Sequence, residues 1–209
     1  MPEEQYTYAV ARIRSRELQL LDDAFIRQLM AAGSYEECRD LLAGKGWGKE
    51  GRTEMEQMLS DERDKAWNLI GELVEDMSVF DVFRYANDYQ NLKTAVKLVY
   101  ADTEEDGLFV GQGTVDPARM LEAVRTQDDS PLPEAMRGPA KEAYEALMHT
   151  RDGQLCDRIL DRAALEAIYQ AGNTRENRLL QQYAELTVAA ADIKIAVRAQ
   201  KTGKSPEWI

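Results

Sequence analysis

The sequence is short of the residue types from which reaction centres and metal sites are usually built. Among its 209 residues are one histidine and two cysteines, which excludes a site that needs several imidazoles and a framework of disulfide bonds. Lysine and arginine number 26 against 38 aspartates and glutamates, for a formal net charge of −12. A charge of this sign disfavours general binding to nucleic acid or to an anionic lipid surface.

Long apolar runs are absent as well. No stretch approaches the roughly 18 consecutive apolar residues of a membrane-spanning helix. The first five residues, Met1 to Gln5, are polar and acidic, which is unlike the start of a signal peptide. The expected setting is therefore the reducing cytoplasm.

Residues that favour strands are scarce, and residues that favour helices are abundant. Aromatic residues make up 8% of the chain, whereas alanine, leucine and glutamate together make up 68 of its 209 residues. This composition predicts an all-α fold and argues against sandwiches, barrels and doubly wound sheets.

Apolar spacing and capping residues place the expected helices along the chain. Their ranges are 5–18, 23–32, 35–43, 53–77, 79–100, 117–125, a segment from after Pro133 to Met148, 154–171 and 175–201. The expected N-caps are Asp22, Ser34 in a capping box with Glu37, Asp116 before Pro117, and Asn173 with Thr174. Gly33 and Gly172 are expected to end helices.

Two of these helices share one pattern of apolar residues at an offset of 101 positions. The shared positions are Val82, Tyr85, Tyr89, Leu92 and Val96 in the first, and Tyr183, Leu186, Ala190, Ile193 and Val197 in the second, where Leu179 extends the pattern. Spacings of three and four predict a narrow seam that packs against neighbouring helices. Because Asn91–Lys97 also matches Asp192–Arg198, we interpret the pattern as a helical unit used at least twice, with a weaker third copy at the start of the chain.

No catalytic, cofactor-binding or metal-ligating residue is predicted. The glycine-rich stretch 44–51 lacks the spacing of a phosphate-binding loop and is interpreted as a connector, and Gly111–Gly113 as a turn. His149 lies near a predicted helix end, where an imidazolium interacts well with exposed carbonyls, and this role is favoured over catalysis. Cys38 and Cys156 lack the spacing of metal ligands and are interpreted as small apolar side chains.

Four basic residues lie in two pairs, each four positions apart: Lys93 with Lys97, and Lys194 with Arg198. Each pair occupies one face of its predicted helix. Two interpretations stay open. The residues are solvated or ion-paired charges on an acidic protein, or they form a local basic surface for an acidic partner, whose binding would weaken with salt.

Several short motifs follow one another along nearly the whole chain. They are Tyr6–Arg14, Asp88–Lys93 with Lys97, Gly113–Asp116, Leu121–Val124, and Tyr183 with Asp192–Lys194 and Ala196–Arg198. In this order and spacing they resemble the C subunit of archaeal and bacterial vacuolar-type (V/A-type) rotary ATPases, which is called the d subunit in eukaryotic complexes.

The resemblance implies an all-helical fold of three related bundles around a pseudo-three-fold axis, with a funnel-like shape. On this basis residues 1–78 are expected to form the first helical unit, 79–174 the second, and 175–209 the start of a third. Members of the family continue well beyond this length, so the chain is expected to be a truncated member or a fragment.

The function implied by the resemblance is mechanical and non-catalytic. In this family the C subunit seats the central stalk, made of the D and F subunits, on the membrane rotor ring and passes torque between ATP chemistry and ion transport, without a cofactor. It would lie at the cytoplasmic face of the membrane as part of a peripheral complex, and Lys93, Lys97, Lys194 and Arg198 are candidates for contacts with stalk or ring. The alternatives are a helical-repeat adaptor for an unrelated soluble partner and an all-helical enzyme such as a phosphohydrolase, which lacks the histidines for a metal cluster.

Overall fold

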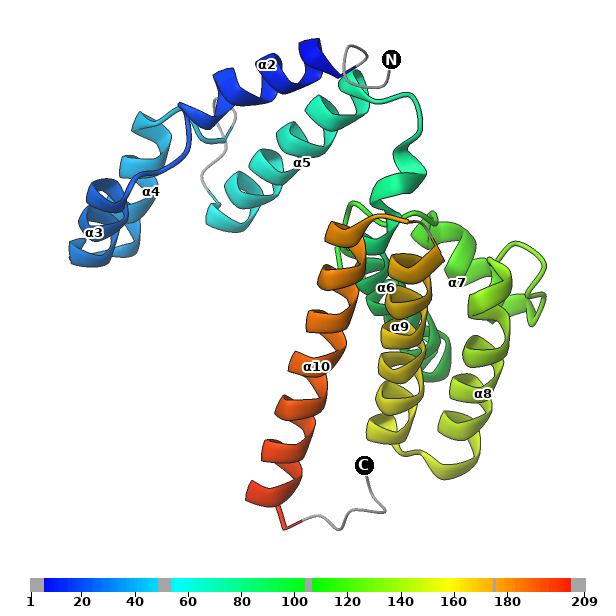
Figure 1. Cartoon of the computed structure of the whole chain (residues 1–209). Helices are drawn as coiled ribbons and strands as arrows, with labels where there is room; N and C mark the ends of the chain where they lie inside the picture. The colour runs from blue at the N-terminus through cyan, green and yellow to red at the C-terminus, as the bar shows by residue number, and fades with distance from the viewer. Residues whose placement is uncertain (1–5, 49–53, 104–106, 175, 204–209) are drawn as a thin grey trace. The chain divides into compact units, whose positions relative to one another are not determined.

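The structure is a computed structural model that describes residues 6–48, 54–103, 107–174 and 176–203. Over these residues every regular element is a helix, with no strand (Figure 1). The all-α fold expected from composition is therefore confirmed. The chain divides into two compact units, Met1–Met77 and Ser78–Ile209.

The described residues of the first unit form four helices. They are α2 (Thr7–Glu17), α3 (Asp23–Ala31), α4 (Tyr35–Gly44) and α5 (Met55–Leu73). Two of the predicted N-caps are confirmed, because Asp22 accepts a hydrogen bond from the Phe25 amide at 2.8 Å and Ser34 from the Glu37 amide at 3.1 Å. Glu37 accepts from the amide of Gly33, one residue before the position that a capping box requires.

A small core holds α3, α4 and α5 together. Phe25, Leu42 and Met58, one from each helix, are buried in a single cluster, and Trp47 packs against its edge. The glycine-rich segment after α4, described as far as Gly48, turns back on this core, and its Gly46 carbonyl accepts a hydrogen bond from the ammonium group of Lys65 at 3.3 Å. Residues 49–51 of the expected connector lie outside the described residues.

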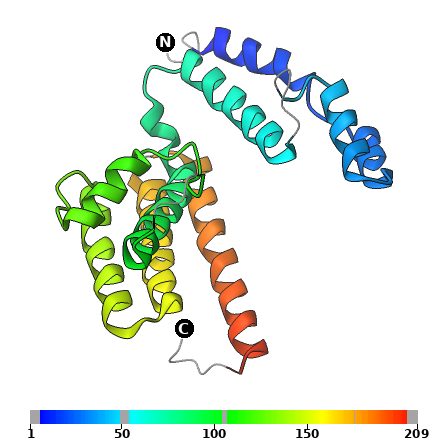
Figure 2. The ribbon, with the colours of Figure 1, turned by 180° about the vertical axis from the view of Figure 1, so that it is seen from behind.

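The second unit is larger and is arranged around α6 and α9 (Figure 2). Its elements are the 3₁₀-helix η1 (Met77–Phe83), α6 (Tyr85–Ala101), α7 (Pro117–Thr126), α8 (Glu134–Thr150), α9 (Gly153–Thr174) and α10 (Arg178–Lys201). Helix α6 packs against α7, α8 and α9, and α9 packs in addition against α10. The Asp116 cap with Pro117 at the first helical position is confirmed.

The seam predicted for the 79–100 helix lies in the core of this unit. Val82, Tyr89, Leu92 and Val96 are buried, and the last three share one cluster with side chains from α7, α8 and α9. The Tyr89 hydroxyl donates a hydrogen bond to the Ala135 carbonyl at 3.2 Å, so its one polar group is satisfied. Apolar spacing identified the buried face of α6 correctly.

Two helix boundaries differ from the prediction around residue 78. The helix expected over 53–77 ends at Leu73, and the α-helix expected from 79 begins at Tyr85. Val74 has extended backbone angles that suit its β-branched side chain, and residues 77–83 form a 3₁₀-helix instead. The sequence predicted a break near Ser78, but apolar periodicity on both sides of it concealed its full extent, from Val74 to Arg84.

The prediction that Gly172 ends a helix and that Asn173–Thr174 cap the next is wrong. Helix α9 continues to Thr174, and the cap of α10 is Asn177, whose side chain accepts hydrogen bonds from the Leu179 and Leu180 amides. Gly172 is buried inside α9 where α10 approaches closely. An added Cβ there would overlap the Cβ of Ala184 and lie 2.8 Å from the Leu180 carbonyl oxygen.

Most of the seam predicted for the last helix is exposed among the described residues, but Tyr183 is packed, with its ring centroid 4.5 Å from that of Phe83. Leu179, Leu186 and Ile193 are 69%, 70% and 65% exposed. Helix α10 instead buries a different face, containing Leu180 and Ala184, against α9 and η1. Helix α6 is thus central and α10 peripheral, and their equivalence in a repeat stays a prediction.

Candidate functional site

Two of the four predicted contact residues form ion pairs within the second unit. Lys93 on α6 pairs with Asp161 on α9, and Lys97 pairs with Asp157 at 2.6 Å. The side chain of Lys93 is only 14% exposed. These two pairs join the same faces of α6 and α9 one helical turn apart, so the solvated or ion-paired interpretation describes both lysines within this chain.

The other two predicted contact residues lie on α10 and are exposed. Lys194 and Arg198 lie close to the exposed seam, and Arg198 also lines a groove of about 500 Å³ between α10, α9 and α8. The groove has an apolar floor that includes Ile159 and Ile195, and its rim carries both acids and arginines. The structure therefore separates the two predicted pairs: one stabilises a helix contact, and the other faces solvent. Their role in partner contacts stays a prediction.

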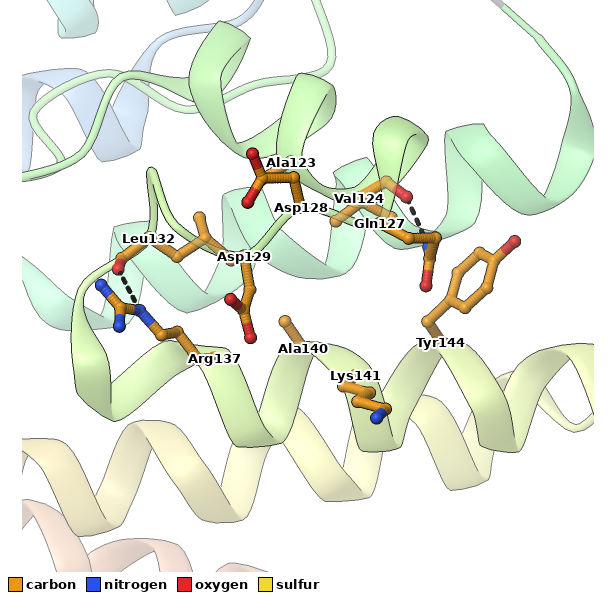
Figure 3. Close-up of a pocket in the computed structure, with 10 residues that line it drawn as sticks. All are labelled: Ala123, Val124, Gln127, Asp128, Asp129, Leu132, Arg137, Ala140, Lys141 and Tyr144. Carbon is orange, nitrogen blue, oxygen red and sulfur yellow. Dashed lines mark hydrogen bonds between the residues drawn. The ribbon is translucent and has the colours of Figure 1, made fainter.

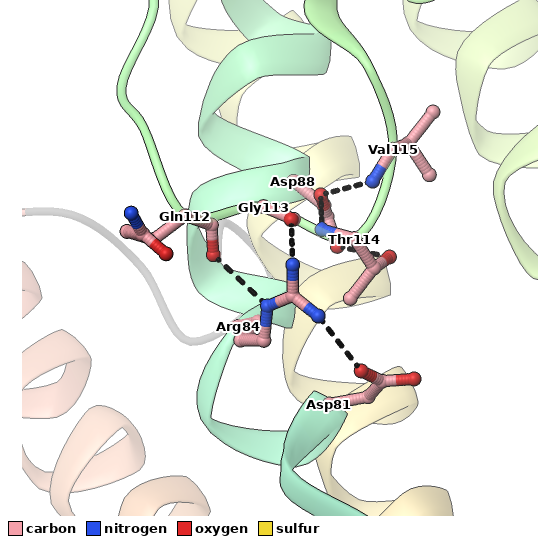
Figure 4. A network of polar contacts seen from close by, with 7 residues as sticks. All are labelled: Asp81, Arg84, Asp88, Gln112, Gly113, Thr114 and Val115. Carbon is pink, nitrogen blue, oxygen red and sulfur yellow. Dashed lines mark hydrogen bonds and ion pairs between the residues drawn. The ribbon is translucent and has the colours of Figure 1, made fainter. Parts of the chain in front are cut away.

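A buried polar network fixes the segment before α7 to α6 (Figure 4). The fully buried carboxylate of Asp88 accepts hydrogen bonds from the Thr114 amide and hydroxyl, both at 2.7 Å, and from the Val115 amide at 3.1 Å. Burial raises the pKa of Asp88 above its ordinary value, although the hydrogen bonds from Thr114 and Val115 and the charge of Arg84 oppose the shift. An added Cβ at Gly113 would overlap this carboxylate, so glycine is required there.

Arg84 and Asn91 complete the attachment of this segment. The guanidinium of Arg84 donates to the Gln112 and Gly113 carbonyls and pairs with Asp81 at 3.2 Å (Figure 4). The buried amide of Asn91 both donates to the Val110 carbonyl and accepts from the Val110 amide. Segment 110–115 is therefore held rigidly along α6, and Gly111–Gly113 is the turn that was expected. The sequence analysis did not predict this network. The one sign of it in the sequence was that Asp88 and Asn91 lie on the same helix as the buried seam.

A second hollow, of about 370 Å³, lies between α7, the segment after it and α8 (Figure 3). Two of its polar side chains bind the backbone: Arg137 donates to the Leu132 carbonyl at 2.9 Å, and Gln127 to the Val124 carbonyl at 2.6 Å. Asp128 accepts from the Ser130 amide, and this hydrogen bond lowers the pKa of its carboxyl. These contacts shape the α7–α8 connection.

The residues discounted as reactive groups lie where a structural role explains them. The His149 imidazole contacts the Glu145 carbonyl at 2.7 Å in the last turn of α8. Cys156 is buried in the core, and Cys38 donates weakly to the Leu29 carbonyl. Among the described residues no group of three or more histidines, cysteines and acids could hold a metal ion, and none of the described helices has the length and apolarity to cross a bilayer.

Comparison with known proteins finds a family model over most of the chain. The model described as ATP synthase (C/AC39) subunit matches residues 9–209. Relatives include the C subunit of the A-type ATP synthase of Methanocaldococcus jannaschii, with 25% identity over 97% of this chain and 56% of the relative. The C subunit of the V-type sodium ATPase of Enterococcus hirae is 24% identical over 83% of this chain and 52% of its own length.

A third relative, the C subunit of the A-type ATP synthase of Methanosphaera stadtmanae, is 28% identical over 93% of this chain and 54% of the relative. The chain therefore spans about half the length of the curated relatives that it matches.

Proposed function

The chain belongs to the ATP synthase (C/AC39) subunit family, and from that premise we propose that it is a non-catalytic rotor subunit of a V/A-type rotary ATPase. In this role it links the central stalk, made of the D and F subunits, to the membrane rotor ring, and it passes torque between ATP chemistry and ion transport. The observation that carries the proposal is the family match over residues 9–209.

The construction of the second unit supports a mechanical role. A part that transmits torque must not yield, and close-packed helices transmit strain rather than absorb it. Helix α6 is fixed to α9 by the Lys93 and Lys97 ion pairs and to segment 110–115 by the buried network around Asp88. Hydrogen bonds to a buried carboxylate are stronger than neutral ones and costly to break.

The proposed location is the cytoplasmic face of the membrane, within a peripheral complex. The net charge of −12 makes an acidic lipid surface a poor partner for the chain itself. Contacts through proteins of the stalk and ring are therefore the proposed means of attachment, and exposed basic residues such as Lys194 and Arg198 are candidates for contacts with acidic groups on those proteins.

Reconstitution from purified parts tests this function. The chain is mixed with the complex of the D and F subunits, and separately with detergent-solubilised rotor ring, and each mixture is resolved by size-exclusion chromatography at low salt. Co-elution with stalk or ring, without ATP hydrolysis by the chain alone, is the expected result. If the chain elutes apart from both, the rotor role is refuted, and a helical adaptor for another soluble protein takes its place.

A further inference from the structure

We propose that η1 is a winding switch with two helical forms, the 3₁₀-helix of the structure and an α-helix continuous with α6, and that the packing of Val79 selects the first. The proposal goes beyond the rotor role and does not depend on it, because it concerns the backbone of residues 77–83 within this chain.

The 3₁₀-helix η1 is long for its kind. It spans seven residues, Met77–Phe83, whereas runs beyond three or four residues are uncommon, because the hydrogen bonds of a 3₁₀-helix have poorer geometry than those of an α-helix. Neither glycine nor proline occurs between residues 74 and 84, so the sequence permits an α-helix there. Helix α6 begins at Tyr85 and would supply the nucleus from which that helix extends.

The register of the apolar residues explains why the 3₁₀ form prevails. At three residues per turn, Val79, Val82 and Tyr85 lie in line, and all three belong to the cluster that joins η1 to α9 and α10. At roughly 100° per residue, an α-helix continued back from the seam of α6 would place Ser78 at the centre of the seam and Val79 roughly 100° away from it. A serine would then replace a valine against α9 and α10. One apolar residue therefore holds the 3₁₀ winding.

The C-terminal end of η1 is fixed to the second unit. The Phe83 ring packs on Tyr183 of α10 with centroids 4.5 Å apart, and the guanidinium of Arg84 donates to two carbonyls of segment 110–115. Before the other end of η1, Val74 has extended backbone angles and belongs to no helix. Rewinding would therefore move the N-terminal end of η1 and leave the C-terminal end in place.

A hollow beside η1 leaves room for this change. Its volume is about 210 Å³, and it lies between η1, α9 and α10, where Val79, Ala171 and Leu180 line it. An α-helix is wider than a 3₁₀-helix, because each of its turns holds more residues with less rise per residue. The space on this side of η1 therefore accommodates the α form.

Rewinding would change the connection between α5 and α6 in length and in phase. The seven residues of η1 span roughly 14 Å as a 3₁₀-helix and roughly 10.5 Å as an α-helix. The winding differs by roughly 20° per residue, which amounts to roughly 140° over the segment. Tension along the chain therefore favours the 3₁₀ form and compression favours the α form, so η1 responds to load between its two ends.

Solution NMR of the whole, isotopically labelled 209-residue chain tests the switch. Close contacts between a Cα hydrogen and the amide hydrogen two residues later mark a 3₁₀-helix, and contacts four residues later mark an α-helix. The wild type should show the first pattern over residues 77–83. The double variant Ser78→Val with Val79→Ser moves the valine to the centre of the α-helical seam and should show the second pattern, with the amide signals of α7 unchanged.

Two single substitutions control for the change of side chain. Val79→Ile keeps an apolar, β-branched residue in the 3₁₀ register and should retain the wild-type pattern. Val79→Ala removes two methyl groups from the contact without adding a polar group, and it should shift the ratio of the two forms toward the α form by roughly tenfold. Relaxation dispersion on the amides of residues 77–83 measures this ratio.

An α pattern in the wild type, or a 3₁₀ pattern in the double variant, overturns the proposal. Loss of all helical contacts over residues 77–83 while the rest of the double variant stays folded also overturns it, because η1 would then have no second helical form. If the double variant does not fold, Val79→Ala decides alone, and an unchanged ratio refutes the switch. No rotary component enters the experiment, so its failure is distinct from failure of the rotor role.

Discussion

Replacing Gly172 by alanine should destabilise the contact between α9 and α10. In a free helix this change is favourable by about 0.5–1 kcal/mol, because glycine loses more backbone entropy on folding. In this chain the new Cβ would overlap the Ala184 Cβ and lie 2.8 Å from the Leu180 carbonyl oxygen. Neither atom belongs to a flexible side-chain end, so α10 as a whole would have to shift.

The expected size follows from the two opposing effects. Overpacking of a close contact typically costs about 1–3 kcal/mol, and the helix-propensity gain offsets part of it. A net loss of about 1–2 kcal/mol in the free energy of unfolding remains. At about 2–4 °C of Tm per kcal/mol for a chain of this size, the melting temperature should fall by several degrees.

Thermal and urea unfolding followed by far-ultraviolet circular dichroism measures this loss. The control is Gly71→Ala, since Gly71 lies exposed in α5 with no atom within 4 Å of an added Cβ; it should be neutral or stabilising by up to about 1 kcal/mol. If Gly172→Ala changes the free energy of unfolding no more than Gly71→Ala does, the close approach of α10 to α9 does not explain why position 172 is glycine.

Three further changes test other parts of the second unit. Asp88→Ala should cost about 2–4 kcal/mol, because it leaves the amides of Thr114 and Val115 without their buried acceptor; urea denaturation measures this loss, and a change below about 1 kcal/mol would contradict it. Burial raises the pKa of Asp88, so its titration stabilises the fold most at low pH, and this contribution is lost as pH rises through the raised pKa. The free energy of unfolding of Asp88→Asn should therefore be closer to that of the wild type at about pH 7 than at about pH 3, measured by the same urea denaturation. Lys97→Ala, at a half-exposed ion pair, should cost less than about 1 kcal/mol, and less still in high salt.

The sequence predicted best what neighbouring residues determine. The caps at Asp22, Ser34 and Asp116 depend on a side chain and an amide two or three residues away, and the structure has them as expected. The buried face of α6 was also predicted correctly. Its apolar residues form a single stripe, and neighbouring helices pack on that side.

Gly172 shows what local patterns cannot decide. A glycine after an apolar helix and before Asn173 matches a helix stop, but the same residue also permits two helices to approach closely. The choice between these depends on Ala184 and Leu180, which belong to the next helix. The network around Asp88 was missed for the same reason, since its donors lie 26 and 27 residues further along the chain.

The two apolar faces of α10 explain why its spacing alone did not identify the face that packs against α9. A helix that packs on one side only carries one apolar stripe, and its position then identifies the core. Helix α10 carries a short stripe of Leu180 and Ala184, which α9 buries, and the longer seam that begins at Leu179. Spacing alone favours the longer stripe, although the shorter one makes the contact. Tyr183 of the longer seam packs with Leu180 and Ala184 against η1 and α9, and Gly172 lets α9 approach α10 at Ala184. The face that makes the contact is therefore decided by residues outside α10, which the spacing within α10 does not contain.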